Sequence, residues 1–248
     1  MCIRDRIAPR HPVSVVRVSP EIWRVSNGLV EFECSPVGLL QLRDAQGVDQ
    51  LSAPLRPCRY RDRGEFWDAW DIAADYRRHP LELEPVGSVQ LLESGPLVAQ
   101  LVVTYRVGAS RMRLDLRLKA DCPWLELIVS VDWCQRHELL RLDIPLASTA
   151  VRLAADTSGG VIERPAHPQT PREQERWEVP AISWLASQAK APGGGIAVLL
   201  DGPQGVDGAT DRLGVSLLRG ATWPDPSADQ GQQRMRLALM PFQGGWAH

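Results

Sequence analysis

The stretch RMRLDLRLKADCPWLELIVSVDWCQRHELLRLDIPL, at residues 111–146, decides the fold of this chain. Its first part alternates between apolar residues (Met112, Leu114, Leu116 and Leu118) and charged residues. A period of two is typical of a strand with one buried face. The alternation returns at residues 124–133, and residues 139–146 form a third apolar run. The stretch therefore predicts three paired antiparallel strands, whose apolar face needs a second sheet to cover it.

Short apolar segments between turn signals fill the rest of the chain. Asn27-Gly28, for example, is a strong hairpin signal. Residues 56–79 lack a period of two and predict an ordered loop with a helical turn, and residues 152–170 predict an irregular segment. No helix longer than about two turns is expected. Further strands are predicted at residues 13–18, 23–25, 29–34, 39–43, 81–86, 89–93, 97–107, 181–186, 195–200, 213–218 and 234–240.

Composition narrows the class of protein. A chain of 248 residues can bury a sizeable core, and an all-β fold of this length is often one domain. The net charge of −2 and the absence of a Lys/Arg cluster in the sequence argue against a nucleic-acid partner. No apolar run is long enough to cross a membrane, and no apolar signal core opens the chain. Five cysteines without a CxxC pair favour free thiols in a reducing compartment, so we expect a cytoplasmic protein.

The two ends of the chain look different from its middle. Residues 1–12 begin with MCIRDR, which is not typical of a folded domain, and we expect a disordered or artefactual segment there. Residues 13–248 are predicted to form a single β-sandwich domain, truncated at its C-terminal end because the sequence stops soon after a strand. The natural termini are therefore expected to lie outside this chain.

Residues for catalysis or metal binding are sparse. The five histidines are scattered, and none forms a ligand pair of the kind that holds zinc. A GxSxG nucleophile elbow is absent, and Gly193-Gly194-Gly195 is better explained as a hairpin turn than as a phosphate loop. The sequence therefore assigns no catalytic residue and no metal ligand to this chain.

The densest candidate site is EFWDAWD at residues 65–71. Aromatic faces stack on the C–H surfaces of sugars, and carboxylates accept hydrogen bonds from sugar hydroxyls. We therefore predict a sugar subsite formed by Trp67, Asp68, Trp70 and Asp71. Two other interpretations remain open. In one, the tryptophans close the sandwich edge while the aspartates cap turns or pair with Arg59, Arg61 and Arg63; in the other, paired carboxylates act as a glycosidase acid and nucleophile.

Six segments in this order resemble the C-terminal β-domain of class II α-mannosidases, glycoside hydrolase family thirty-eight. The last of them and the VDW segment are the most specific. They are FWDAWDI (66–72), ESGPLVAQL (93–101), VDWCQRHELLRLDIP (131–145), RPAHPQTPREQERWEVPAISWL (164–185), LLDGPQGVD (199–207) and LGVSLLRGATWPDPSADQG (213–231).

The resemblance implies an all-β, two-sheet antiparallel (super)sandwich of the galactose-mutarotase-like carbohydrate-enzyme type. It also implies that this chain is a fragment of a zinc-dependent retaining α-mannosidase that removes terminal α-mannose from oligosaccharides. The zinc ligands and the aspartate nucleophile of the family belong to an N-terminal barrel that is followed by a helical domain, and neither set of residues maps onto this chain. The fragment alone is thus expected to be inactive and to hold no cofactor.

Some positions depart from the family pattern. Gly231-Gln232-Gln233 stands where Gly-x-His is common, Pro241-Phe242-Gln243-Gly244 where Pro-His-x-Gly is common, and Leu200-Asp201 where Asn-Asp is usual. These departures put a ligand-facing role of those positions in doubt. A stand-alone carbohydrate-binding module and a purely structural β-sandwich remain the alternatives, and association into a homo-oligomer is left open.

Overall fold

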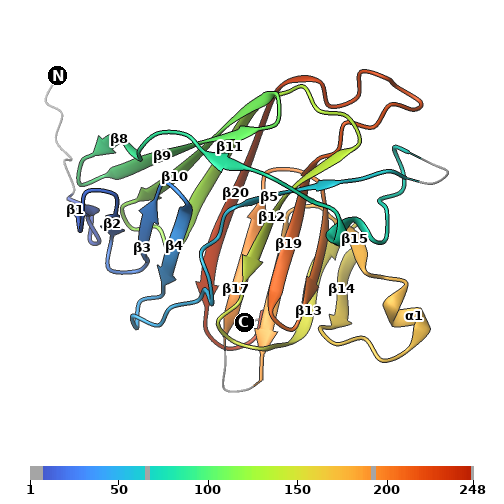
Figure 1. Cartoon of the computed structure of the whole chain (residues 1–248). Coiled ribbons are helices and arrows are strands. Elements are labelled where there is room, and N and C mark those ends of the chain that lie inside the picture. The colour runs from blue at the N-terminus through green and yellow to red at the C-terminus, as the bar shows by residue number, and fades with distance from the viewer. Residues whose placement is uncertain (1–7, 65–67, 191–193, 247–248) are drawn as a thin grey trace, which may run out of the picture.

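The structure, a computed structural model, describes residues 8–64, 68–190 and 194–246. Antiparallel strands dominate these residues and form three sheets (Figure 1). The helical elements among them are the short helix α1 (Pro171–Gln174) and the 3-10 turn η1 (Tyr76–Arg78). Both are shorter than two turns, and the helical turn expected within residues 56–79 is η1. The predicted fold class, an all-β antiparallel sandwich, is confirmed.

The largest sheet contains the first two strands of the stretch at residues 111–146. Its ten strands lie in the following spatial order: β14 (Gly160–Pro165), β13 (Ala150–Thr157), β16 (Trp184–Ala189), β17 (Gly195–Leu200), β20 (Gly231–Phe242), β11 (Leu125–Trp133), β10 (Ser110–Lys119), β9 (Val98–Val107) and β7 (Glu84–Pro85), with β8 (Gln90–Ser94) also paired to β9.

Two smaller sheets complete the fold. The six-stranded sheet has the order β15 (Glu178–Ala181), β18 (Gln204–Ala209), β19 (Arg212–Leu218), β12 (Glu138–Pro145), β5 (Pro57–Arg61) and β6 (Pro80–Leu81). The four-stranded sheet has the order β1 (Ser14–Arg17), β2 (Trp23–Ser26), β3 (Glu31–Ser35) and β4 (Gly38–Arg43).

One hydrophobic core joins the three sheets. Leu114 of β10 lies opposite Val129 of β11, and both side chains are fully buried. Val215 of β19 comes from the six-stranded sheet and Phe32 of β3 from the four-stranded sheet, and both belong to the same buried cluster. Each such side chain contributes about 1.5–3 kcal/mol when fully buried. The two larger sheets therefore form the sandwich, and the four-stranded sheet extends it at one end (Figure 1).

The structure corrects the prediction for the third strand of residues 111–146, which was expected to pair with the second. β10 and β11 pair as expected, but β12 does not pair with β11. It leaves the ten-stranded sheet and pairs with β19 and β5 in the six-stranded sheet. The turn between β11 and β12 contains His137, whose φ of 53° lies in the left-handed region. The apolar face of β12 still points into the core, which is why its sequence pattern resembles that of its neighbours.

Several strands lie where the sequence predicts none. β5 lies inside the segment predicted as a loop, and the hairpin of β13 and β14 lies inside the segment predicted as irregular. β15 and β18 pair with each other at the edge of the six-stranded sheet. Of the N-terminal segment, residues 1–7 lie outside the described residues, while the amide of His11 donates to the Asp121 carboxylate at 2.7 Å.

Candidate functional site

The structure separates the residues of the predicted sugar subsite. Trp67 lies outside the described residues. Trp70 is 66% exposed and Asp71 is also exposed, so both face solvent. Asp68 points into the protein, and only 15% of its side chain is exposed. Trp70 and Asp71 are therefore the described part of the predicted subsite that a ligand can reach.

Asp68 is bonded to a second loop, residues 219–230, which leads into β20. Its Oδ2 accepts hydrogen bonds from the Thr222 amide at 2.6 Å, the Thr222 hydroxyl at 3.1 Å and the Trp223 amide at 3.2 Å. Bonds to an ionised carboxylate are stronger than bonds between neutral groups. Asp68 thus ties the described segment that it begins, residues 68–75, to the 219–230 loop.

His137 completes this junction from the β11–β12 turn. Its Nδ1 lies 3.5 Å from Asp68 Oδ1, and its Nε2 lies 3.1 Å from the Thr222 hydroxyl. Burial of Asp68 raises the pKa of its carboxyl, but the bonds from Thr222 and Trp223 and the nearby His137 outweigh that effect and hold the pKa below its ordinary value. We call Asp68, His137 and Thr222 the loop junction.

A pair of exposed tryptophans stands next to the loop junction. The ring centroids of Trp70 and Trp223 are 5.4 Å apart, and the ring planes meet at 61°. Trp223 is 50% exposed. The two rings come from two different loops, and Figure 1 shows both loops projecting from the same side of the molecule. They form one aromatic surface that is open to solvent.

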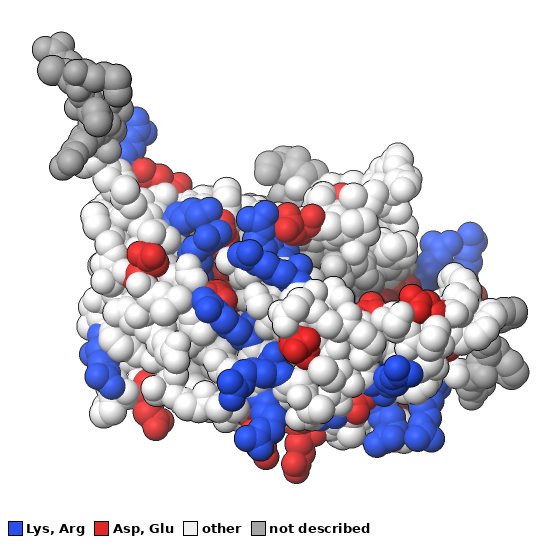
Figure 2. Space-filling model, turned by 90° about the horizontal axis from the view of Figure 1, so that it is seen from above, with Lys and Arg blue, Asp and Glu red and all other residues white. Residues whose placement is uncertain are grey.

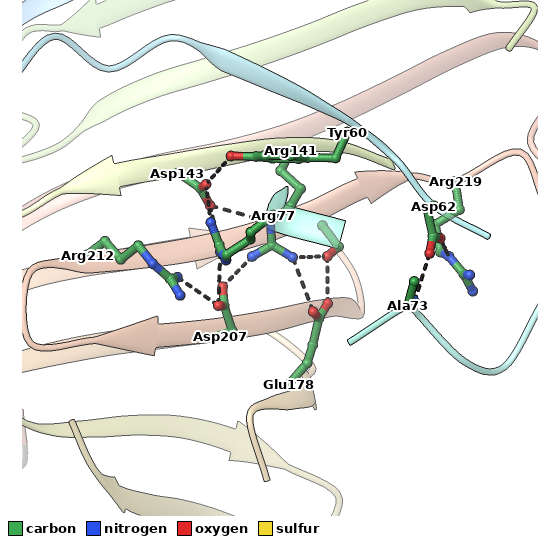
Figure 3. Close-up of polar contacts among 11 residues, drawn as sticks. Tyr60, Asp62, Ala73, Arg77, Arg141, Asp143, Glu178, Asp207, Arg212 and Arg219 are labelled. Atoms are coloured by element: carbon green, nitrogen blue, oxygen red, sulfur yellow. Dashed lines mark hydrogen bonds and ion pairs between the residues drawn. The ribbon is translucent and has the colours of Figure 1, made fainter. Parts of the chain in front are cut away.

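A second tie holds the same two loops together (Figure 3). Asp62 is almost fully buried and accepts hydrogen bonds from Arg219 Nε at 2.6 Å and from the Ala73 amide at 2.8 Å. The Arg219 guanidinium also donates to the main-chain carbonyl of Asp71. Arg59 takes no part in these contacts, because it pairs with Glu138 at 2.6 Å.

A charged network lies beside these loops and involves residues of β12, β18 and β19 in the six-stranded sheet (Figure 3). Its centre is Arg141 of β12, whose side chain is completely buried. The guanidinium donates to Asp207, to Glu178 at 3.2 Å and to the Ser216 hydroxyl at 2.6 Å. A buried arginine of this kind needs carboxylate partners, since an unpaired buried charge is costly.

Two further arginines complete the network. Arg77 of η1 donates to Asp143 at 2.8 Å and to Asp207 at 3.1 Å, and Arg212 donates to Asp207 at 2.7 Å. Burial raises the pKa of Asp143, but Arg77 and Arg141 reverse the shift and hold the pKa below its usual range. Because this network is buried and joins η1 to the sheet, we interpret it as structural rather than as a ligand site.

Charge also gathers on the outer face of the ten-stranded sheet. Arg106 of β9 and Arg111 of β10 are direct cross-strand partners, and both are exposed. Nearby arginines have acidic partners: Arg113 Nε donates to Asp115 at 2.8 Å. Figure 2 shows Lys and Arg side chains in a band across the face seen from above, with Asp and Glu among them. The pairing of β9 with β10 therefore places Arg106 beside Arg111 on this sheet.

The parts of the chain that the structure describes do not support a metal centre. No group of three or more His, Cys, Asp or Glu side chains there is arranged to hold a metal ion. The described residues offer no donor set for the zinc ion that the family resemblance implies for the longer protein. Within the same residues, no helix is long and apolar enough to cross a membrane.

Sequence reasoning missed Trp223, Thr222 and His137. Trp223 stands in TWPDPSADQG, which the sequence marks as a loop, and a tryptophan between turn-forming residues is the one local signal of an exposed ring. No local signal could connect it with Asp68, since the two loops lie 154–155 positions apart.

Comparisons with known proteins agree with this architecture. Residues 25–227 match the family model of the glycosyl hydrolases family 38 C-terminal domain. Alpha-mannosidase 2C1 of Homo sapiens is 26% identical over 249 residues, which cover 97% of this chain and 24% of that protein. The chain thus spans about a quarter of the length of this curated relative.

Solved structures show the same fold. An alpha-mannosidase from Enterococcus faecalis V583 superposes with a TM-score of 0.73 at 11% identity, covering 89% of this chain and 29% of that chain. A protein described as an aldose 1-epimerase from Klebsiella pneumoniae superposes with a TM-score of 0.51 at 10% identity, covering 94% of this chain and 83% of that chain. The second likeness confirms the predicted galactose-mutarotase-like sandwich at the level of the fold. Because the family model covers most of the chain, we conclude that this chain belongs to glycosyl hydrolase family 38, as its C-terminal domain.

Proposed function

We propose that this chain is part of a longer α-mannosidase that hydrolyses terminal α-mannose residues of oligosaccharides. The observation that carries the proposal is the family match over residues 25–227, together with a relative that is named an alpha-mannosidase and is about four times as long. The part of the protein outside this chain would then contain the catalytic barrel and the helical domain.

The chemistry is proposed to lie in that other part. A zinc ion there would bind the sugar and polarise it during a retaining reaction with an aspartate nucleophile. The described residues of this chain contribute no donor set for the metal. Their role is to pack against the barrel and to form part of the wall of the cleft, where Trp70 and Asp71 are the exposed residues of the predicted subsite. We also propose a cytoplasmic location.

The test compares the 248-residue chain with the full-length protein on para-nitrophenyl α-mannoside, with and without added zinc. The full-length protein is expected to release nitrophenol, to lose activity with a chelator and to give the α-anomer of mannose as the first product by NMR. The isolated chain is expected to show no turnover above the buffer rate. Zinc-dependent turnover by the isolated chain, or a full-length protein without mannosidase activity, would overturn the proposal.

A stand-alone carbohydrate-binding module is the second candidate. The exposed Trp70–Trp223 pair favours it, because an aromatic surface of this kind can bind sugar without any catalytic group. The reading frame upstream of Met1 separates the two candidates. A frame that continues into a barrel with a His-x-Asp motif supports the enzyme, whereas a frame that opens at Met1 supports the module.

A further inference from the structure

The Trp70–Trp223 pair is unusual because two large apolar rings are held in solvent by an ordered framework. Trp70 is 66% exposed and Trp223 is 50% exposed, while the loops beneath them are tied through buried or half-buried carboxylates. Burying a tryptophan ring is strongly favourable, so a fold that holds two of them outward forgoes stabilisation. Exposed aromatic clusters of this kind mark binding surfaces.

We propose that Trp70 and Trp223 form a carbohydrate-binding platform for a neutral pyranose ring, and that Asp68 and His137 position the platform without touching the sugar. The proposal rests on the proposed function, which supplies mannose-containing oligosaccharide as the ligand class. It differs from the subsite predicted from the sequence in two ways. Trp223 becomes a sugar-binding residue, and Asp68 becomes a positioning residue.

The geometry of the rings suits one sugar. The planes are inclined at 61° with centroids 5.4 Å apart, so the two rings form an angled surface rather than a flat one. A pyranose can place its C–H face on one ring while the edge of the sugar contacts the other. This arrangement excludes water from the apolar side of the sugar and leaves its hydroxyls free for hydrogen bonds.

The loop junction explains why the platform is ordered before a sugar arrives. Asp68 binds the main chain of Thr222 and Trp223 directly, and it belongs to the loop that presents Trp70. His137 reaches the same carboxylate and the Thr222 hydroxyl from the β11–β12 turn. Because both rings are ordered in advance, the entropic cost of sugar binding is lower.

Charge near the platform favours a neutral ligand with hydroxyl donors. Asp71 follows Trp70 in the chain and its carboxylate is exposed, so it can accept hydrogen bonds from sugar hydroxyls. A phosphate or carboxylate on the ligand would be repelled by the same group. The platform is thus expected to bind mannose and mannobiose and to discriminate against a phosphorylated mannose.

The test measures mannobiose binding to the 248-residue chain by calorimetry, with circular dichroism confirming that each variant is folded. Trp70→Ala and Trp223→Ala are each expected to weaken binding about tenfold, which corresponds to about 1.4 kcal/mol. Trp223→Phe keeps an aromatic face and is expected to retain most of the affinity. Trp246→Ala is the matched control, because Trp246 belongs to a second tryptophan pair, with Trp184, whose centroids are 5.6 Å apart. Unchanged affinity in both platform variants would overturn the proposal.

Asp68→Asn tests the positioning role separately. It is expected to weaken mannobiose binding and to broaden the indole N–H resonances of Trp70 and Trp223, because the rings lose their fixed orientation. A loss of affinity with sharp, unshifted resonances would mean that Asp68 touches the sugar, and that part of the proposal would fail.

The same variants in the full-length protein distinguish this inference from the proposed function. If the rings pack against the rest of the protein, Trp70→Ala and Trp223→Ala lower its Tm and leave its KM for mannobiose unchanged, which overturns the platform and leaves the mannosidase intact. If the full-length protein binds mannobiose through the rings but hydrolyses no mannoside, the proposed function fails and the platform stands.

Discussion

The Thr222 amide donates a hydrogen bond to Asp68 Oδ2 at 2.6 Å, although the two residues are 154 positions apart in the sequence. This bond joins a segment that follows β5 to the loop that precedes β20. Trp70 follows Asp68 by two positions and Trp223 directly follows Thr222, so the bond ties together the two segments that contain the tryptophans of the proposed platform.

Replacing Asp68 should destabilise the chain. In Asp68→Ala the half-buried amide of Thr222 and the more exposed amide of Trp223 lose their acceptor, and leaving a buried donor unsatisfied costs about 1–3 kcal/mol. Urea-induced unfolding followed by circular dichroism measures the loss. Asp71→Ala is the control, because the Asp71 side chain is exposed and its removal should change the free energy of unfolding by less than about 0.5 kcal/mol. Equal losses in the two variants would contradict the role assigned to Asp68.

The contribution of Asp68 should also depend on pH. Its pKa in the folded chain is held below the ordinary value, so the folded state favours the ionised carboxyl. Such a group contributes stability above its unfolded pKa of about 3.9, and that contribution disappears as the pH falls through the lower folded pKa. The difference in free energy of unfolding between the wild type and Asp68→Ala should therefore be largest near about pH 7 and shrink below about pH 4. A difference that stays constant across this range would show that the charge of Asp68 is irrelevant.

Gly214 should be intolerant of any side chain. A Cβ at this position in β19 would overlap the Asp207 carboxylate and the Arg141 guanidinium, which form the centre of the buried network. Gly214→Ala must separate that ion pair, and breaking a buried pair costs about 3–5 kcal/mol. Gly160 begins β14 and has nothing within 4 Å of the corresponding Cβ position, so Gly160→Ala serves as the control. Thermal unfolding of both variants measures the loss of stability. A Gly214→Ala chain as stable as the wild type would show that the network can rearrange.

Two cysteines should differ in reactivity. Cys34 is fully buried, and burial raises the pKa of its thiol to about 12, so almost no thiolate forms near neutral pH. Cys134 is exposed at the end of β11. Since the thiolate is the reactive form, iodoacetamide should modify Cys134 in the folded chain and Cys34 only after unfolding. Peptide mass spectrometry reads out both sites, and rapid modification of Cys34 in the folded chain would mean that the four-stranded sheet opens readily.

Most strands with one apolar face could be predicted from the sequence. Leu114 and Leu116 belong to the alternation of apolar and charged residues that predicts β10, and this alternation is a local property of the sequence. β13 escaped prediction because Ala154 and Ala155 are both buried, which leaves a run of small residues without alternation. β14 is mostly exposed at the sheet edge, so it has no apolar face to recognise. The segments that carry the family resemblance do not identify these strands either, because β13 and most of β14 lie between the segments at residues 131–145 and 164–185.

The sequence by itself determined the all-β class, the strands of the central hairpins and the membership of the glycosidase family. It also marked the 65–71 segment as rich in tryptophan and aspartate. Only the tertiary structure decided that β12 changes sheet, that Asp68 turns inward to hold Thr222, and that Trp70 meets Trp223. The reason is physical. Alternation records which face of a strand is buried but not which strand lies beside it, and contacts between residues more than 150 positions apart exist only once the sheets have packed.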